Sequence, residues 1–127
     1  MDIGAVRDGL AFAIAEAGMD TVYTYVPERP IPNCAIIEPD NEFLRVYEGQ
    51  YGPDYASNWR VQIIVRFATN SKETTELDNV LNDLVPAIWE NTDVNRLSVD
   101  KPFILEVNGA NFLATNINVS IDMQGGN

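Results

Sequence analysis

Apolar residues recur at helical spacing in two parts of the chain. Within residues 2–18 they form one stripe, made of Ile3, Val6, Leu10, Ala13, Ile14 and Ala17. Asp2 can cap the start of a helix and Gly18 suits its end, so the pattern predicts one amphipathic helix between them. The second stripe consists of Leu77, Val80, Leu81, Leu84 and Ile88. It predicts a helix that begins at Ser71 and is kinked, not ended, by Pro86.

β-branched and aromatic residues predict strands in the rest of the chain. The strongest alternation covers residues 59–67. Its inward residues are Trp59, Val61, Ile63, Val65 and Phe67, and its outward residues include Arg60, Gln62 and Arg66. Shorter strands are predicted at 21–26, 33–38 and 43–47, and prolines end the first two because proline lacks the N–H of a β-ladder. Residues 91–102 are predicted to form a polar connection.

The C-terminal part predicts a β-hairpin around Asn108-Gly109, with strands at 103–107 and 111–123. A two-residue turn would pair Leu105 with Phe112 and place the apolar residues of the two strands on opposite faces. A three-residue loop at 108–110 would place them together. Because register follows burial, we expect the three-residue loop.

These elements predict an α+β fold with one mostly antiparallel sheet of about five strands and both helices packed on its apolar face. The 127 residues fit a single domain over 1–127. Gly49, Gly52 and Pro53 indicate that residues 40–58 form a long hairpin loop around the short strand 43–47.

Three surfaces are candidate contacts with other subunits. Phe12 projects from the polar side of the first helix, between Asp8 and Glu16. Either that helix is buried on two sides or Phe12 meets another subunit, and we favour the subunit contact because a small domain has little to place on a second helix face. The polar face of the sheet, with Arg60 and Arg66, would face water or a partner.

Tyrosines in the expected loop at 40–58 form the third candidate surface. Tyr47, Tyr51 and Tyr55 lie in or beside this loop. Tyrosine supplies a large contact area at a low cost in side-chain entropy, which favours a contact surface. The alternative is a flexible hairpin tip without a partner.

The composition offers little for chemistry. The chain has no histidine, so the usual general base and the Ser-His-Asp and Cys-His systems are missing. Its one cysteine, Cys34, lies in an apolar run and is expected to be a small buried residue. Without phosphate-binding or metal-binding motifs, we expect neither enzymatic activity nor a cofactor. Nothing resembles a signal peptide or a membrane span, so we expect a protein made in a reducing cytoplasm and no membrane partner.

The charge is strongly acidic, with a formal net value of −11. Such a charge opposes nonspecific adsorption to nucleic acid and to anionic lipid. It can serve solubility alone, or the field can have a functional use.

The order of features resembles one protein family, most sharply over residues 22–39. There, Val22-Tyr23-Thr24-Tyr25-Val26 is followed by prolines at 27, 30 and 32 and by Cys34-Ala35-Ile36-Ile37-Glu38-Pro39. An opening helix with Arg7 and Leu10, a tyrosine-containing loop before Trp59-Arg60-Val61, an acidic helix with Glu76-Leu77-Asp78 and a closing hairpin complete the layout. This layout resembles the tail-terminator (tail-completion) proteins of siphoviruses, especially of phages that infect actinobacteria.

The resemblance implies a structural virion protein at the head–tail junction, assembled in the host cytoplasm. Such proteins form homohexameric rings on the head-proximal end of the tail tube, stop tube polymerisation and dock to the head–tail connector. DNA passes through the ring without being bound specifically, and an acidic lumen would repel it. A ring needs head-to-tail contacts, so each subunit presents two different patches.

Two alternatives stay open at the level of the sequence. One is another neck or tail ring protein of a phage, such as a connector stopper or a tube subunit. The other is a monomeric acidic binding module or DNA mimic. The oligomeric state distinguishes the ring proteins from the monomeric module.

Overall fold

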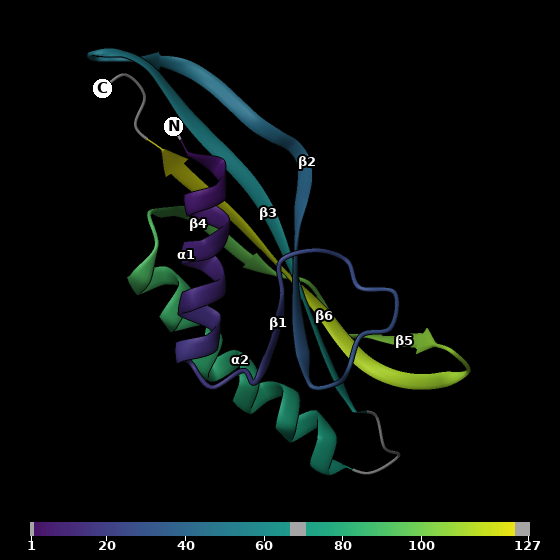
Figure 1. Ribbon diagram of the computed structural model, residues 1–127. Helices are drawn as coiled ribbons and strands as arrows, with labels where there is room; N and C mark the ends of the chain where they lie inside the picture. Colours follow the sequence, from purple (N-terminus) through teal and green to yellow (C-terminus); the bar gives the residue numbers. More distant parts are fainter. Residues whose placement is uncertain (1, 67–70, 124–127) are drawn as a thin grey trace.

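The fold has two helices and one six-stranded sheet (Figure 1). The computed structural model describes residues 2–66 and 71–123. The helices are α1 (Ile3–Glu16) and α2 (Ser71–Asn91). The strands are β1 (Thr21–Tyr23), β2 (Cys34–Gly49), β3 (Gly52–Arg66), β4 (Val94–Val99), β5 (Phe103–Val107) and β6 (Ala110–Met123). The α+β class is confirmed, with six strands in place of about five.

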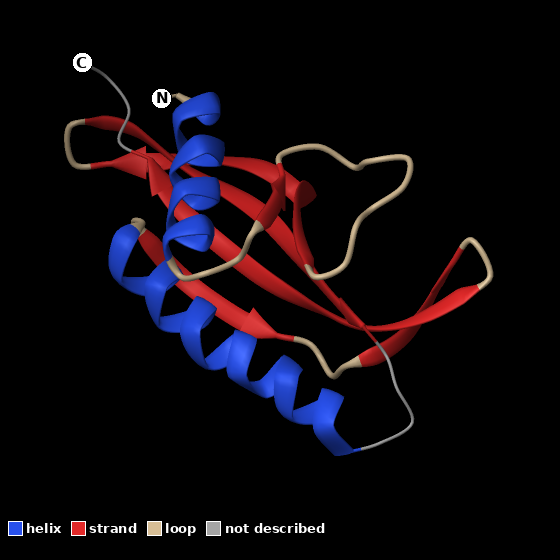
Figure 2. Cartoon of the chain, turned by 60° about the horizontal axis from the view of Figure 1, so that its bottom comes forward, coloured by secondary structure: helices blue, strands red, loops and turns tan. Residues whose placement is uncertain are grey.

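The long strands β2, β3 and β6 form the centre of the sheet. β3 lies between the other two and is antiparallel to both. The strand order is β1-β2-β3-β6-β4, with β1 parallel to β2. β4 and β5 pair with different halves of β6, β4 with the C-terminal half and β5 with the N-terminal half. Both helices lie on the same face of the sheet, as the sequence predicts (Figure 2).

The main core lies between the helices and the sheet. Leu10 and Ile14 of α1 and the predicted stripe of α2 meet the inward residues of β3 there. Trp59 is fully buried at the centre of this core. Its ring packs edge-on against Phe43 with the centroids 4.9 Å apart, and the Arg7 guanidinium lies 5.1 Å from its centroid. Apolar burial of this kind is the main source of the fold's stability.

The ends of α1 follow the sequence signals. The Asp2 side chain accepts a hydrogen bond from the Ala5 N–H at 3.0 Å, which satisfies one of the unpaired donors at the helix start. Gly18 follows the helix with a φ of +109°, a conformation that glycine adopts without steric cost. α2 continues through Pro86 to Asn91, as expected.

The expected three-residue loop at 108–110 is wrong. Val107 pairs with Ala110 and Leu105 with Phe112, so the turn has two residues, Asn108 and Gly109. A three-residue loop would be needed only if the sheet had a single core. The sheet has a second, smaller core on its other face, formed by Cys34, Ile36, Ile64 and Ala114 with Tyr23, Phe103, Leu105 and Phe112 packed against it. Phe103 and Leu105 of β5 are half-buried against this core, on the face opposite the helices.

The expected long loop at 40–58 is also wrong. Strand β2 continues past Pro39 to Gly49, turns at Gln50-Tyr51 and pairs with β3 from Gly52 onwards. On its outer side β2 has a strand partner only over 34–36, so Pro39 occupies an edge position, where a missing N–H is tolerated. The two glycines serve this tight turn: Gly52 has a φ of +124°, and a Cβ on Gly49 would lie 2.7 Å from the Gly52 carbonyl oxygen.

Other strand boundaries also differ from the prediction. Strand β1 ends at Tyr23, so Tyr25 and Val26 lie in a loop. The segment 91–102 is not only a connection, because β4 pairs with β6 there. An irregularity in the pairing between Val94 and Arg96 interrupts the alternation of side chains between the two faces of the sheet. The sequence therefore lacks the regular alternation that would predict this strand. Phe67, the last residue of the predicted strand 59–67, lies outside the described residues.

Cys34 is buried in the second core, as expected. Burial raises the pKa of the Cys34 thiol from 9.0 to about 11, because the thiolate loses its solvation there. Since the folded pKa lies above the unfolded one, the thiol's contribution to stability is complete below pH 9 and is lost as the pH rises through 11.

We therefore expect Cys34 to resist alkylation in the folded protein. At pH 8, iodoacetamide should leave the native chain unmodified for hours and should modify it fully in a denaturing concentration of guanidinium, because the thiolate is the nucleophile and unfolding exposes it. Mass spectrometry of the intact chain measures the modified fraction. Rapid labelling of the native chain, at the rate of free cysteine, would contradict the buried position.

Candidate functional site

Metal-ligating side chains are not clustered in the part of the chain that the structure describes. No group of three or more His, Cys, Asp and Glu side chains is placed to hold a metal ion within this part of the chain. None of its helices is long and apolar enough to span a bilayer. The candidate residues predicted from the sequence all belong to possible contact surfaces.

The outer face of α1 is the first contact surface. Asp8, Phe12 and Glu16 are exposed on this face, opposite the buried Leu10 and Ile14. Phe12 is 68% exposed. Of the two alternatives for this helix, burial on both sides is therefore excluded within the chain. The subunit contact at Phe12 stays a prediction.

The distal part of the β2–β3 hairpin, residues 44–54, is the second surface, and we call it the hairpin arm. It extends beyond the rest of the sheet, because β6 pairs with β3 only from Tyr55 onwards (Figure 1). Tyr51 at its turn is 92% exposed. Its two strands are paired as a ladder up to the turn, and its contact with another subunit stays a prediction.

The three tyrosines of the predicted surface do not share one face. Tyr55 is opposite Val46 in the ladder and Tyr47 opposite Asp54, so Tyr47 and Tyr55 project from opposite sides of the hairpin. The Tyr47 hydroxyl donates to the Asp122 carboxylate at 3.4 Å. Desolvation, followed by the negative charges of Asp122 and Asp54, raises the pKa of Tyr47. The raised pKa favours the protonated hydroxyl, which is the form that donates to Asp122.

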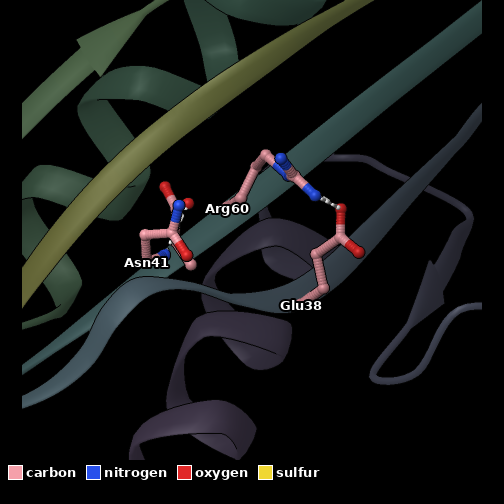
Figure 3. Close-up of polar contacts among 4 residues, drawn as sticks. Glu38, Asn41 and Arg60 are labelled. Carbon is pink, nitrogen blue, oxygen red and sulfur yellow. Dashed lines mark hydrogen bonds and ion pairs between the residues drawn. The ribbon is translucent and has the colours of Figure 1, made fainter.

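Arg60 and Arg66 lie on the sheet face opposite the helices, as predicted. Figure 3 shows Arg60 of β3 facing Glu38 of β2. The Arg60 Nη2 lies 2.7 Å from Glu38 Oε1, and Nε donates to the same oxygen at 2.8 Å. Arg60 is thus engaged within its own chain, whereas Arg66 is exposed at the end of β3. A contact of either residue with another subunit stays a prediction.

One exposed apolar surface was missed by the sequence interpretation. Residues 24–33 link β1 to β2, and we call them the proline loop. Tyr25, Val26 and Ile31 in this loop are 63–66% exposed. The strand predicted at 21–26 had assigned Tyr25 and Val26 to a β-ladder. The three prolines at 27, 30 and 32 were the signal that residues around them could not be covered by a neighbouring strand.

A groove of about 730 Å³ lies beside the start of α1. It is lined by Ala5, Val6 and Gly9 of α1, by residues 91–94 where α2 leads into β4, and by the end of β6 at 121–123. We call it the helix groove. Its lining contains Asp2, Asp93 and Asp122 and no lysine or arginine.

Comparison with solved structures finds a similarity over nearly the whole chain. No family model matches the sequence. A chain in the virion of a native gene transfer agent (GTA) particle has a similar structure, with a TM-score of 0.56 and 13% sequence identity. The similarity covers 97% of this chain and 95% of that chain. At this identity it shows a common fold.

A second match is local. A segment of 75 residues, 56% of the chain, is 35% identical to a (-)-limonene synthase, chloroplastic, from Picea sitchensis. The chain spans 12% of the length of that enzyme. So small a share does not indicate a common activity.

Proposed function

We propose that the chain is a structural subunit of a phage-like virion, and more specifically a tail-terminator protein that forms a homohexameric ring on the head-proximal end of a tail tube. The observation that carries this proposal is the common fold with a chain of the gene transfer agent virion, which extends over nearly the full length of both chains. The resemblance of residues 22–39 to tail terminators supports the narrower role.

The surfaces of the molecule support a ring. A closed ring requires two different patches on each subunit, because its contacts join unlike surfaces. The proline loop and the hairpin arm are exposed, carry apolar residues and lie apart from each other in both views (Figures 1 and 2). A chain with two separate patches of this kind can bind a neighbour on each side.

The charge supports passage of DNA without binding. Six copies of a chain with a net charge of −11 would surround the central opening with a negative field. DNA phosphates would be repelled from the wall, so the duplex could slide through without being held. In this proposal the partners are the tail-tube protein below the ring and the head–tail connector above it.

The proposal is tested by imaging and by a polymerisation assay. Negative-stain electron microscopy of the purified chain should show rings with a central opening, and light scattering should give the mass of a homohexamer. When the chain is added to polymerising tail-tube protein from the same genome, it should be found at one tube end and should stop growth there.

The outcomes separate the proposal from its rivals. Rings that bind the connector and ignore the tube would indicate a different neck protein. Incorporation along the tube wall would indicate a tube subunit. A strict monomer that binds neither protein would contradict the virion role and favour the acidic binding module.

A further inference from the structure

Strands β2 and β4 each have an edge without a strand partner. The strand order is β1-β2-β3-β6-β4, and β1 covers β2 only over residues 34–36. Within the described residues, no strand lies beside the outer edge of β2 in the hairpin arm or beside the outer edge of β4. Figure 1 shows β2 and β4 on opposite sides of β3 and β6. Such free edges carry unpaired N–H and C=O groups, which another strand can bind.

The hydrogen bonds of β4 show which of its residues face outward. The Asp100 N–H donates to the Asn116 carbonyl at 2.9 Å, so these two residues form a hydrogen-bonded pair. Hydrogen-bonded and non-hydrogen-bonded pairs alternate along an antiparallel ladder. The register of β4 with β6 is regular from Leu97 to Val99. Leu97 and Val99 therefore direct their N–H and C=O groups away from β6, towards the free edge.

The turn of the hairpin arm sets the same alternation in β2. The residues on either side of a two-residue turn form a hydrogen-bonded pair. The next pair in the arm, Glu48 with Pro53, is therefore a non-hydrogen-bonded pair, which fits because proline has no N–H. The register stays regular back to Leu44. Leu44, Val46 and Glu48 therefore direct their backbone groups away from β3, towards the free edge.

Exposed apolar residues occupy outward-facing positions on both edges. Leu44 and Val46 are 37% and 58% exposed, and Val99 is 38% exposed. Val99 pairs with Ile117 of the main core and Leu44 pairs with the buried Ser57, so both lie on the face of the sheet that the helices cover. Proteins usually protect free edges with proline or charged residues, and Leu44, Val46 and Val99 are neither. Both edges thus favour a strand partner that carries apolar side chains.

The two free edges fit each other in direction and in height. β2 and β4 run in opposite directions, because both successive neighbours between them, β3 and β6, are paired antiparallel. One row of ladder partners crosses the sheet from Leu44 through Ser57 and Ile121 to Val94. The free edge of the arm and the free edge of β4 therefore begin at the same height of the sheet.

A rotation about an axis along the strands preserves the direction of each strand and the side on which the helices lie. It would place the arm edge of a second copy beside β4 of the first, antiparallel and with the apolar residues of both edges on one face. We propose that the subunits join head to tail in this way, through pairing of residues 44–48 of one copy with residues 94–99 of the next. The two edges are different surfaces, as a ring requires. This inference rests on the proposed ring and names its subunit contact.

Val46→Pro and Val99→Pro test the two edges separately. Each removes an outward N–H and leaves the hydrogen bonds within the chain in place, and proline is tolerated in edge strands. Val46→Thr and Val99→Thr are the matched controls, because threonine keeps the N–H and is branched at Cβ like valine. We expect each proline variant to weaken self-association by about tenfold or more, and each threonine variant to weaken it much less. Sedimentation velocity over a range of concentrations measures this.

Hydrogen exchange of the wild type gives a readout that needs no variant. The N–H groups of Val46, Leu97 and Val99 face the free edges of the single chain and should exchange rapidly at low concentration. Assembly should slow their exchange by about tenfold or more, because they become hydrogen-bonded. The N–H groups of Arg45 and Ser98 face β3 and β6, so they should be protected in both states. Unchanged exchange of the outward N–H groups in the assembled protein would overturn the contact, even if the proline variants fail to fold.

A mixture of the two proline variants tests whether the two edges bind each other. The Val46→Pro chain retains its β4 edge and the Val99→Pro chain retains its arm edge, so one intact contact can form between them. We expect a one-to-one heterodimer and no larger species, because both outer edges of this dimer carry a substitution. This outcome is specific to a head-to-tail contact between these two edges.

Other results would overturn the inference. If both proline variants form rings as the wild type does, the ring uses other surfaces, and the proposed function stands without this contact. If only Val46→Pro loses assembly, the arm binds an edge other than that of β4, such as the outer edge of β5. A wild type that stays monomeric at all concentrations would also overturn the contact, and the tube-capping assay would then decide the proposed function separately.

Discussion

Replacing Trp59 with Ala should cost about 3–5 kcal/mol of the free energy of unfolding, the largest loss expected for one substitution in this chain. The side chain is fully buried and contacts Phe43 and Arg7 across its ring. Its Nε1 donates to the Ser57 Oγ at 2.8 Å, and Ser57 is itself fully buried. The substitution would leave a cavity and an unpaired buried hydroxyl together. Urea denaturation followed by circular dichroism measures the loss.

Trp89 supplies the matched control, because it is the other tryptophan of the chain and is 53% exposed. Trp89→Ala should cost about 1 kcal/mol or less. If Trp59→Ala does not fold at all, Trp59→Phe keeps most of the ring volume and should retain the fold at a smaller cost. Equal losses from Trp59→Ala and Trp89→Ala would show that the core is not centred on Trp59.

Replacing Phe12 with Ser should weaken assembly strongly and leave the subunit folded. Phe12 is mostly exposed, so its truncation should change the free energy of unfolding by no more than about 0.5 kcal/mol. It lies on the outer face of α1, opposite the buried Leu10 and Ile14, where a neighbouring subunit could contact it. Large aromatic residues dominate the binding energy of interfaces, so we expect self-association to weaken by about thirtyfold. Sedimentation velocity and thermal denaturation measure the two effects.

Ala15→Ser is the control for this variant. Ala15 is also exposed on α1, and the change adds a hydroxyl without removing a large side chain. Its assembly should match that of the wild type. A marked drop in the melting temperature of the Phe12→Ser subunit would mean that Phe12 supports the fold, and normal assembly would remove it from the interface.

The helices could be read almost completely from the sequence, because helix signals are local. Asp2, the apolar stripe and Gly18 are enough to define α1, and the stripe of α2 points to the same core. The inward side of β3 follows in the same way from its alternation. The candidate residues Phe12 and Tyr51 could also be identified, because a large apolar or aromatic residue among polar neighbours suggests exposure.

The other strands depended on partners that are distant in the sequence. Gly49, Gly52 and Pro53 have the composition of a loop, yet Leu44 to Glu48 is held as a strand by β3. β4 is a strand because β6 provides an edge for it. The proline loop became a candidate surface only when β1 was found to end at Tyr23. Pairing of this kind is set by tertiary contacts, which local propensity does not determine.

What the sequence by itself determined is the α+β class, the position of both helices on one sheet face, and the buried state of Cys34 and Trp59. Only the tertiary structure decided the register of the last hairpin. β6 places Ile117, Val119 and Ile121 in the main core and Ala114 in the second core, on opposite faces of one strand. Alternation tells which residues share a face, but it does not tell which face is covered at each end of a long strand. That depends on the elements that pack there, and in this chain the helices cover one face and β5 helps to cover the other.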